Sequence, residues 1–148
     1  LTEALLLLYG KEEMEKKWKV LETMPEAERL EKIQEIGQRL VLEFSLSAVV
    51  ITGVNYRENS QTPKMGNLVL EKEKVSWVFA EKSGGSYSGT GDLFASVLSA
   101  GLVKGYSMET CAHMAVEFIS TSIRDAVSEG TDRNDGVCFE EHLGMLLS

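Results

Sequence analysis

One stretch decides how this chain folds: Ser83-Gly84-Gly85-Ser86-Tyr87-Ser88-Gly89-Thr90-Gly91-Asp92-Leu93-Phe94. A polar, glycine-rich segment runs here into an apolar segment of helical composition, Leu93 to Val103. The first N–H groups of a helix have no partner within the helix, and the helix dipole adds partial positive charge at the same end. The junction is therefore predicted to favour an anion such as a phosphate group.

Four residues at this junction are candidates for a site: Gly89, Thr90, Gly91 and Asp92. The two glycines lack a Cβ, so a phosphate group can approach the backbone closely. A carboxylate repels a phosphate, and Asp92 is useful there only if it accepts the proton of a hydroxyl group that attacks the phosphorus. A second interpretation stays open on the residues alone, because Gly-x-Gly before a helix also serves close packing, with the Asp as an N-terminal cap.

The segment Gly89-Thr90-Gly91-Asp92-Leu93-Phe94-Ala95-Ser96 resembles the GTGD signature of the ribokinase-like superfamily. Within that superfamily the chain is most similar to the pyridoxal (pyridoxine, pyridoxamine) kinases. Sugar kinases more often carry GAGD, and hydroxymethylpyrimidine kinases typically carry GTGC, with Cys where this chain has Asp92. The pattern G-x-x-x-x-G-K-[ST] is absent, which disfavours a P-loop kinase. The resemblance covers nearly the whole chain, but only about the C-terminal half of the usual family protein.

The resemblance implies an α/β fold, a ribokinase-like three-layer α/β/α sandwich. This chain is expected to be its C-terminal portion, with a mixed, mainly parallel sheet. Residues 1–148 are expected to form a single domain fragment, the nucleotide-binding half of such a kinase. The chain starts at Leu1, inside an apparent motif, so we expect a fragment. In the family, much of the substrate pocket comes from the N-terminal half, and the isolated chain is expected to be nearly inactive.

The function that the resemblance implies is ATP-dependent phosphorylation of the 5′-hydroxymethyl group of pyridoxal or a related vitamer, in pyridoxal 5′-phosphate salvage. Asp92 is the expected proton acceptor, and the N–H groups around Gly89, Thr90 and Gly91 are expected to bind phosphate. The cofactors are expected to be ATP and Mg²⁺. The alternatives are another ribokinase-like kinase, for hydroxymethylpyrimidine or a sugar, a non-catalytic nucleotide-binding domain, or a purely structural α/β domain.

Two further site residues follow from the resemblance. The opening Leu1-Thr2-Glu3 matches the family's Asn-x-x-Glu motif without its Asn, and Glu3 then corresponds to an acidic residue that helps to hold magnesium through water. Thr52 corresponds to a hydroxyl residue near the nucleotide phosphates, at the nucleotide-binding site. From the residues alone, Glu3 is a first-turn acid favoured by the helix dipole, and Thr52 is a strand residue that caps a turn.

Hydrophobic periodicity predicts the elements around these motifs. Leu1 to Tyr9 is expected to form a short helix that ends at Gly10, and Lys11 to Thr23 a solvated helix or loop without chemistry. A helix follows from Pro25 to about Glu43. Three strands are expected at Ala48 to Val54, Asn67 to Glu71 and Val75 to Ala80, then helices from Leu93 to Val103 and from Ser107, a polar turn at 131–136, and a last helix within Val137 to Leu147. The first strand is apolar on both faces, which suits the middle of a parallel sheet.

Composition excludes several classes of function. The 148 residues are 43% hydrophobic and 26% charged, as in a globular protein, and the net charge of -8 argues against nucleic acid or an anionic membrane as partner. Cys111 and Cys138 form no CxxC pattern and are expected to be reduced thiols, and His113 and His142 have no ligand spacing. No membrane span or signal peptide is visible, so a cytoplasmic protein is expected. A homodimer is implied by the family alone.

Overall fold

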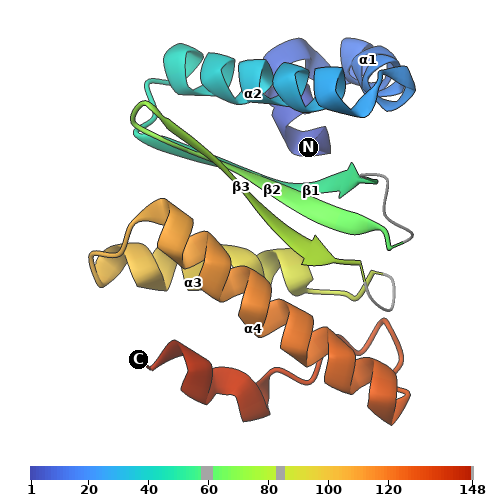
Figure 1. Cartoon of the computed structure of the whole chain (residues 1–148), viewed down its shortest axis with the longest axis vertical. Coiled ribbons are helices and arrows are strands. Elements are labelled where there is room, and N and C mark those ends of the chain that lie inside the picture. Colours follow the sequence, from blue (N-terminus) through green and yellow to red (C-terminus); the bar gives the residue numbers. More distant parts are fainter. Residues whose placement is uncertain (58–61, 83–85, 148) are drawn as a thin grey trace. The chain divides into compact units, whose positions relative to one another are not determined.

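A computed structural model describes residues 1–57, 62–82 and 86–147 of the chain (Figure 1). The chain divides into two compact units, Leu1–Trp77 and Val78–Ser148, which are taken in turn below. The single domain expected for residues 1–148 stays a prediction.

The elements follow in the order α1 (Thr2–Thr23), α2 (Glu26–Glu43), β1 (Ala48–Tyr56), β2 (Lys64–Glu71), β3 (Lys74–Glu81), α3 (Thr90–Val103), α4 (Met108–Glu129) and the 3₁₀ helix η1 (Glu140–Leu146). The predicted α/β class is confirmed. The first unit holds the elements from α1 to β2 and the start of β3, and the second unit holds the rest.

Helix α1 is broken where the sequence predicts its end. Gly10 has φ 72 and ψ 174, which is outside the helical region, and the chain resumes a helix after it. The part from Lys11 to Thr23 buries only Leu21, because most of its side chains are charged. Lys11 to Thr23 therefore forms a solvated helix and not a loop, the two forms expected from the sequence.

Helix α2 forms the core of the first unit together with β1 and β2 (Figure 1). The helix buries Ile33, Ile36 and Leu40 at helical spacing. Gly37 lies on the same face, where an added Cβ would come 2.3 Å from Leu70 Cδ1. The absence of a side chain at Gly37 therefore allows α2 to approach the sheet closely.

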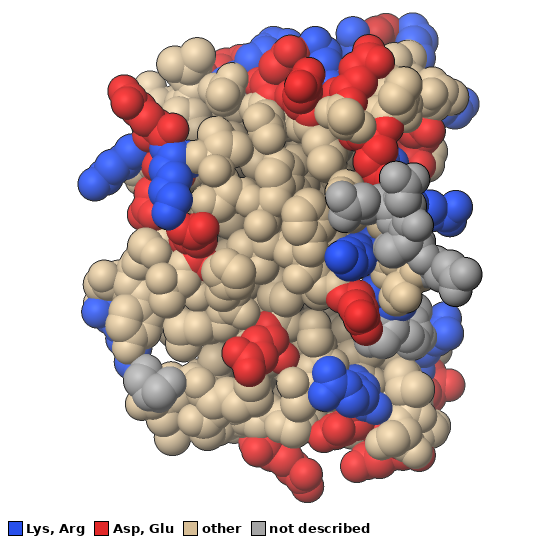
Figure 2. All heavy atoms as spheres, in the orientation of Figure 1, with Lys and Arg blue, Asp and Glu red and all other residues tan. Residues whose placement is uncertain are grey.

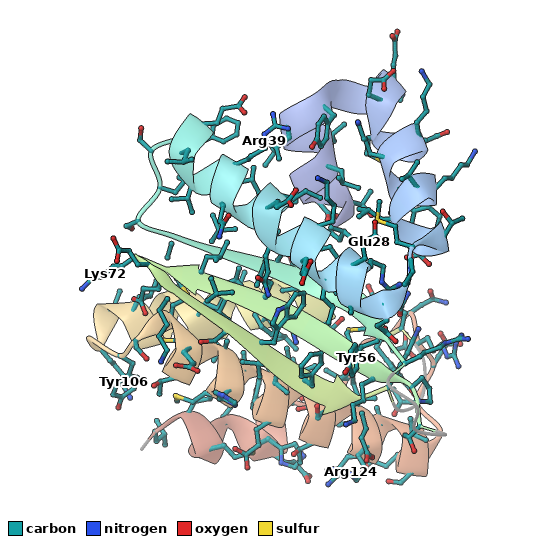
Figure 3. The ribbon with its side chains drawn as sticks, turned by 45° about the horizontal axis from the view of Figure 1, so that its top comes forward. Glu28, Arg39, Tyr56, Lys72, Tyr106 and Arg124 are labelled. Atoms are coloured by element: carbon teal, nitrogen blue, oxygen red, sulfur yellow. The ribbon has the colours of Figure 1, made fainter. Side chains whose placement is uncertain are left out.

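The three strands are hydrogen-bonded in the order β1-β2-β3, and β1 pairs antiparallel with β2, from Ala48↔Glu71 to Tyr56↔Lys64. The prediction of a mainly parallel sheet is wrong for these described strands. The two residues Lys72 and Glu73 join β2 to β3 (Figure 3), whereas a parallel crossover needs a dozen or more. Burial on both faces suggested parallel strands, but it also suits the middle strand of an antiparallel sheet: Leu68, Val69 and Leu70 of β2 are all buried.

A side-chain contact joins α1 and α2 in the first unit. Arg39 of α2, labelled in Figure 3, donates through Nη1 to the hydroxyl of Tyr9 in α1 at 2.9 Å. The guanidinium also lies over the Tyr9 ring, 5.1 Å from its centroid. This contact holds the first part of α1, which ends at Gly10, against α2.

The second unit is built on close packing of α3 against α4. At Gly101 an added Cβ would come 2.5 Å from the Sγ atom of Cys111, so the absence of a side chain there allows α3 to approach α4 closely. Helix α4 starts as predicted, with Ser107 Oγ accepting the N–H of Thr110 at 3.2 Å. Both cysteines are free thiols.

The last predicted helix is the 3₁₀ helix η1. It is tied to α4 by His142, whose Nε2 lies 2.6 Å from Asp125 Oδ2. His142 is therefore a structural residue, as its lack of ligand spacing suggested.

Charged side chains are mixed on the surface of the first unit. Over α1 and α2, at the top of Figure 2, acidic and basic groups lie side by side. None of the helices within residues 1–57, 62–82 and 86–147 is long and apolar enough to cross a membrane.

The core of the first unit can be tested with two substitutions in α2. Ile33 is 0% exposed and Leu42 is 79% exposed. Ile33→Ala is expected to lower the free energy of unfolding by about 2–5 kcal/mol, because it leaves a cavity, and Leu42→Ala by less than about 0.5 kcal/mol. Urea unfolding of both variants measures the difference. Equal effects would contradict the assignment of the buried face.

Candidate functional site

Strand β1 carries a bulge at Thr52 and Gly53. Ile51 pairs with Leu68 and Val54 with Gly66, so two residues of β1 face one residue of β2. Gly53 has φ 74, in the left-handed region that glycine adopts without strain. A bulge of this kind bends the strand and redirects the neighbouring groups. Thr52 is exposed as a result.

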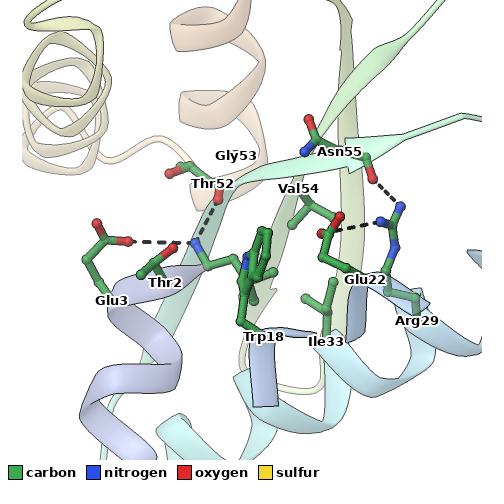
Figure 4. Close-up of a pocket in the computed structure, with 11 residues that line it drawn as sticks. Thr2, Glu3, Trp18, Glu22, Arg29, Ile33, Thr52, Gly53, Val54 and Asn55 are labelled. Atoms are coloured by element: carbon green, nitrogen blue, oxygen red, sulfur yellow. Dashed lines mark hydrogen bonds and ion pairs between the residues drawn. The ribbon is translucent and has the colours of Figure 1, made fainter. Parts of the chain in front are cut away.

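The bulge lies on the wall of a pocket of about 240 Å³ in the first unit (Figure 4). The pocket is lined by Leu1, Thr2, Glu3, Trp18, Glu22, Arg29, Ile33, Thr52, Gly53, Val54 and Asn55. Glu3 and Thr52, which the family resemblance assigns to magnesium and to the nucleotide, therefore line one pocket.

The start of α1 is anchored to the bulge. The nitrogen of Leu1 donates to the Thr52 carbonyl at 3.0 Å. The Glu3 side chain itself is 87% exposed at the rim of the pocket. A carboxylate in this position is open to water, as a ligand in the outer shell of a metal ion must be.

Trp18 and Arg29 also line the pocket, and neither had been assigned a role from the sequence. Trp18 comes from the Lys/Glu-rich half of α1 and is 40% exposed, and Arg29 comes from the first turns of α2 and is 9% exposed. The only sequence signal for Trp18 is a large aromatic residue within a charged segment. Arg29 had no signal, because one arginine in a charged helix resembles its exposed neighbours.

The second unit holds the glycine-rich junction. Ser83 to Gly85 lie outside the described residues. Gly89 has φ 79 and is the N-cap of α3, where the first helical hydrogen bond runs from Leu93 N–H to the Gly89 carbonyl at 3.0 Å. The N–H groups of the three residues from Thr90 to Asp92 precede that bond and have no partner within the helix. Asp92 lies in this first turn and is exposed.

The junction is held in place by the polar turn at 131–136. Tyr87, which is 6% exposed, packs with Ala126 and Val137. The N–H of Ser88 donates to the Arg133 carbonyl at 3.0 Å. The Thr90 hydroxyl donates to the Tyr87 carbonyl at 3.1 Å and so fixes the entry into α3. The turn therefore supports the loop before α3, a role that its sequence did not indicate.

The predicted site residues fall in two regions, Glu3 and Thr52 in the first unit and Gly89 to Asp92 in the second. Among the residues that the structure describes, no three His, Cys, Asp or Glu side chains are grouped so that they could hold a metal ion by themselves. Glu3 as a ligand through water stays a prediction.

The chain matches the phosphomethylpyrimidine kinase family over residues 15–136, and it belongs to that family. It is similar to a crystal structure of a candidate phosphomethylpyrimidine kinase from Bacteroides thetaiotaomicron, with 26% identity and a TM-score of 0.68, over 78% of this chain and 39% of that one. A second crystal form of that protein, solved with pyridoxal, is 25% identical with a TM-score of 0.65, over 78% of this chain and 40% of that one. The chain is also similar to a crystal structure of pyridoxal kinase from Lactobacillus plantarum, with 26% identity and a TM-score of 0.57, over 68% of this chain and 35% of that one.

These matches confirm the resemblance to ribokinase-like kinases and the fold class that it implied. The chain spans about two fifths of the length of the Bacteroides structures. A search of curated proteins found no match.

The bulge in β1 can be tested at Gly53. An added Cβ there meets no atom within 4 Å, so Gly53→Ala introduces backbone strain without a clash. We expect a loss of about 1–2 kcal/mol in the free energy of unfolding, and a smaller loss for Gly53→Asn, because Asn tolerates the left-handed region better. Thermal unfolding of both variants measures this. If Ala and Asn have the same effect, the left-handed backbone at this position is not what sets the bulge.

Proposed function

We propose that this member of the phosphomethylpyrimidine kinase family transfers a phosphoryl group from ATP to the 5′-hydroxymethyl group of pyridoxal or a related B6 vitamer. The observation that carries the proposal is the exposed carboxylate of Asp92 in the first turn of α3, directly after the left-handed Gly89. An anion site and a proton acceptor then lie within one helical turn.

The start of α3 is suited to bind the transferred phosphoryl group. The N–H groups of Thr90, Gly91 and Asp92 have no partner in the helix, and the helix dipole adds positive charge there. An added Cβ on Gly89 or Gly91 would meet no atom within 4 Å, so the space above both residues is open. Backbone dipoles fixed in this way stabilise charge without rearranging during the reaction.

Asp92 is the proposed proton acceptor. In a loose phosphoryl-transfer transition state, the hydroxyl proton leaves late, so an ordinary carboxylate that orients the hydroxyl is sufficient. The proton moves from the substrate hydroxyl to a carboxylate oxygen of Asp92 as the new O–P bond forms, while the bond between the γ-phosphorus and the bridging oxygen breaks and ADP leaves. Asp at this position, where the resembling hydroxymethylpyrimidine kinases typically carry Cys, favours a B6 vitamer as substrate.

The first unit supplies the other proposed contacts. Thr52 is the proposed nucleotide-binding residue, and Glu3 the proposed ligand of Mg²⁺ through water. The exposed carboxylate of Glu3 and the exposed Thr52 on one pocket fit these roles. Bound Mg²⁺ would offset negative charge on the phosphates. A homodimer and a place in pyridoxal 5′-phosphate salvage belong to the same proposal.

Hydroxymethylpyrimidine is the second candidate substrate. The family match and the Bacteroides protein both carry the phosphomethylpyrimidine name. That same protein was also crystallised with pyridoxal, so the name of the family does not separate the two ring types. A sugar as substrate, and a nucleotide-binding domain without transfer, remain the alternatives that an assay has to distinguish.

The substrate class and the base can be tested together in the full-length protein. Phosphate transfer from ATP to pyridoxal, hydroxymethylpyrimidine and ribose is measured for the wild type, Asp92→Asn and Glu117→Gln. Glu117 is an exposed acid on α4, so Glu117→Gln removes one negative charge, as Asp92→Asn does. We expect transfer to pyridoxal, a fall in kcat of about 10²–10⁴-fold for Asp92→Asn, and no change for Glu117→Gln.

Other outcomes would change the proposal. Transfer to another compound of the panel, still dependent on Asp92, would keep the mechanism and replace the substrate. ATP binding without transfer to any compound would contradict the kinase activity and leave a nucleotide-binding domain.

A further inference from the structure

The carboxyl end of β1 is bound by side chains of α2. Arg29 donates through Nη2 to the carbonyl of Asn55. Glu26 Oε1 accepts the N–H of Arg57 at 2.8 Å. The two side chains also bind each other, with Arg29 Nη2 donating to Glu26 Oε1 at 2.7 Å. One ion pair thus holds a carbonyl and an N–H that lie two residues apart on the strand.

This spacing matches a neighbouring parallel strand. In a parallel ladder, a residue of one strand donates its N–H to a carbonyl of the neighbouring strand. Its own carbonyl accepts the N–H of the residue two positions later on that neighbouring strand. Arg29 supplies the donor and Glu26 the acceptor for that pattern at Asn55 and Arg57. The ion pair therefore takes the place of one strand residue and closes this part of the edge of β1.

The guanidinium of Arg29 is buried and faces two carboxylates, and its Nε atom has no hydrogen-bond partner among the described residues. Arg29 is 9% exposed, and its Nη1 lies 3.7 Å from a second carboxylate, Glu22 at the end of α1 (Figure 4). The guanidinium thus joins α1, α2 and β1. Removing Glu26 would leave the buried charge with only the more distant Glu22, a costly change.

The bulge lies between two anchored carbonyls. On one side the Thr52 carbonyl accepts from Leu1 N, and on the other side the Asn55 carbonyl accepts from Arg29. Gly53, in the left-handed region, lies between these two points. Since Thr52 and Asn55 both line the pocket, the anchors determine the shape of the pocket wall.

We propose that Arg29 and Glu26 are positioning residues that hold β1 beyond its bulge and so place Thr52 for the nucleotide. The nucleotide half of this inference rests on the function proposed above. The anchoring of β1 does not depend on it.

The test uses the full-length protein with the variants Glu26→Ala, Arg29→Lys and, as control, Glu28→Ala. Glu28 is an exposed acid in the same turn of α2. Hydrogen exchange of the Arg57 amide reports the anchoring, and calorimetric titration with Mg·ATP reports the positioning. Urea unfolding of each variant separates these readouts from global stability.

Glu26→Ala is expected to speed exchange of the Arg57 amide by about tenfold or more, the equivalent of one lost hydrogen bond. Arg29→Lys leaves Glu26 in place, so Arg57 stays protected, but one ammonium cannot reproduce both bonds of the guanidinium. Both variants are expected to bind Mg·ATP about tenfold more weakly. Glu26→Ala loses its bonds to Arg29 and to the Arg57 N–H, and Arg29→Lys loses one bond of the guanidinium, so both weaken the hold on β1 beyond its bulge. Glu28→Ala is expected to match the wild type in both readouts.

Unchanged Arg57 exchange in folded Glu26→Ala would overturn the anchoring. Wild-type affinity for Mg·ATP in Arg29→Lys would overturn the positioning role, and this variant decides the question if Glu26→Ala does not fold. A wild type that binds no nucleotide would overturn the proposed function and with it the positioning of Thr52, while the exchange experiment would still decide whether the pair anchors β1.

Discussion

Left-handed backbone at two glycines is the constraint on which both candidate regions depend. Gly53 lets β1 form a bulge and turns Thr52 out of the ladder, and Gly89 lets the chain turn directly into α3. A side chain with a Cβ would strain either position. Neither glycine is needed for packing, because an added Cβ would meet no atom within 4 Å. The two glycines serve the local backbone path that exposes polar groups.

Each region is supported by neighbours that carry no chemistry in the proposed reaction. In the first unit, Leu1 N and the Arg29–Glu26 pair hold the strand on either side of the bulge. In the second unit, buried Tyr87 and the Arg133 carbonyl hold the loop before α3. Fixed dipoles and carboxylates are effective in phosphoryl transfer because they need little rearrangement in the transition state.

The sequence predicted these features to different degrees. Periodicity located α2 and the three strands, and the capping residue Ser107 marked the start of α4, because these signals are local. The direction of β1 against β2 was missed, since an apolar strand looks the same in a parallel and an antiparallel sheet. The places of Trp18 and Arg29 in the pocket were missed because they depend on contacts between α1, α2 and β1. A pattern along one helix does not encode such contacts.

The central claim is that the start of α3 binds the phosphates of a nucleotide. The most direct test is the change in the backbone amide resonances of Thr90, Gly91 and Asp92 when a non-hydrolysable Mg·ATP analogue, or adenosine, is added to the full-length protein. We expect large shifts of these three amides with the analogue and small ones with adenosine, because the phosphates are the ligand. Equal shifts with both compounds, or shifts confined to other residues, would contradict this claim.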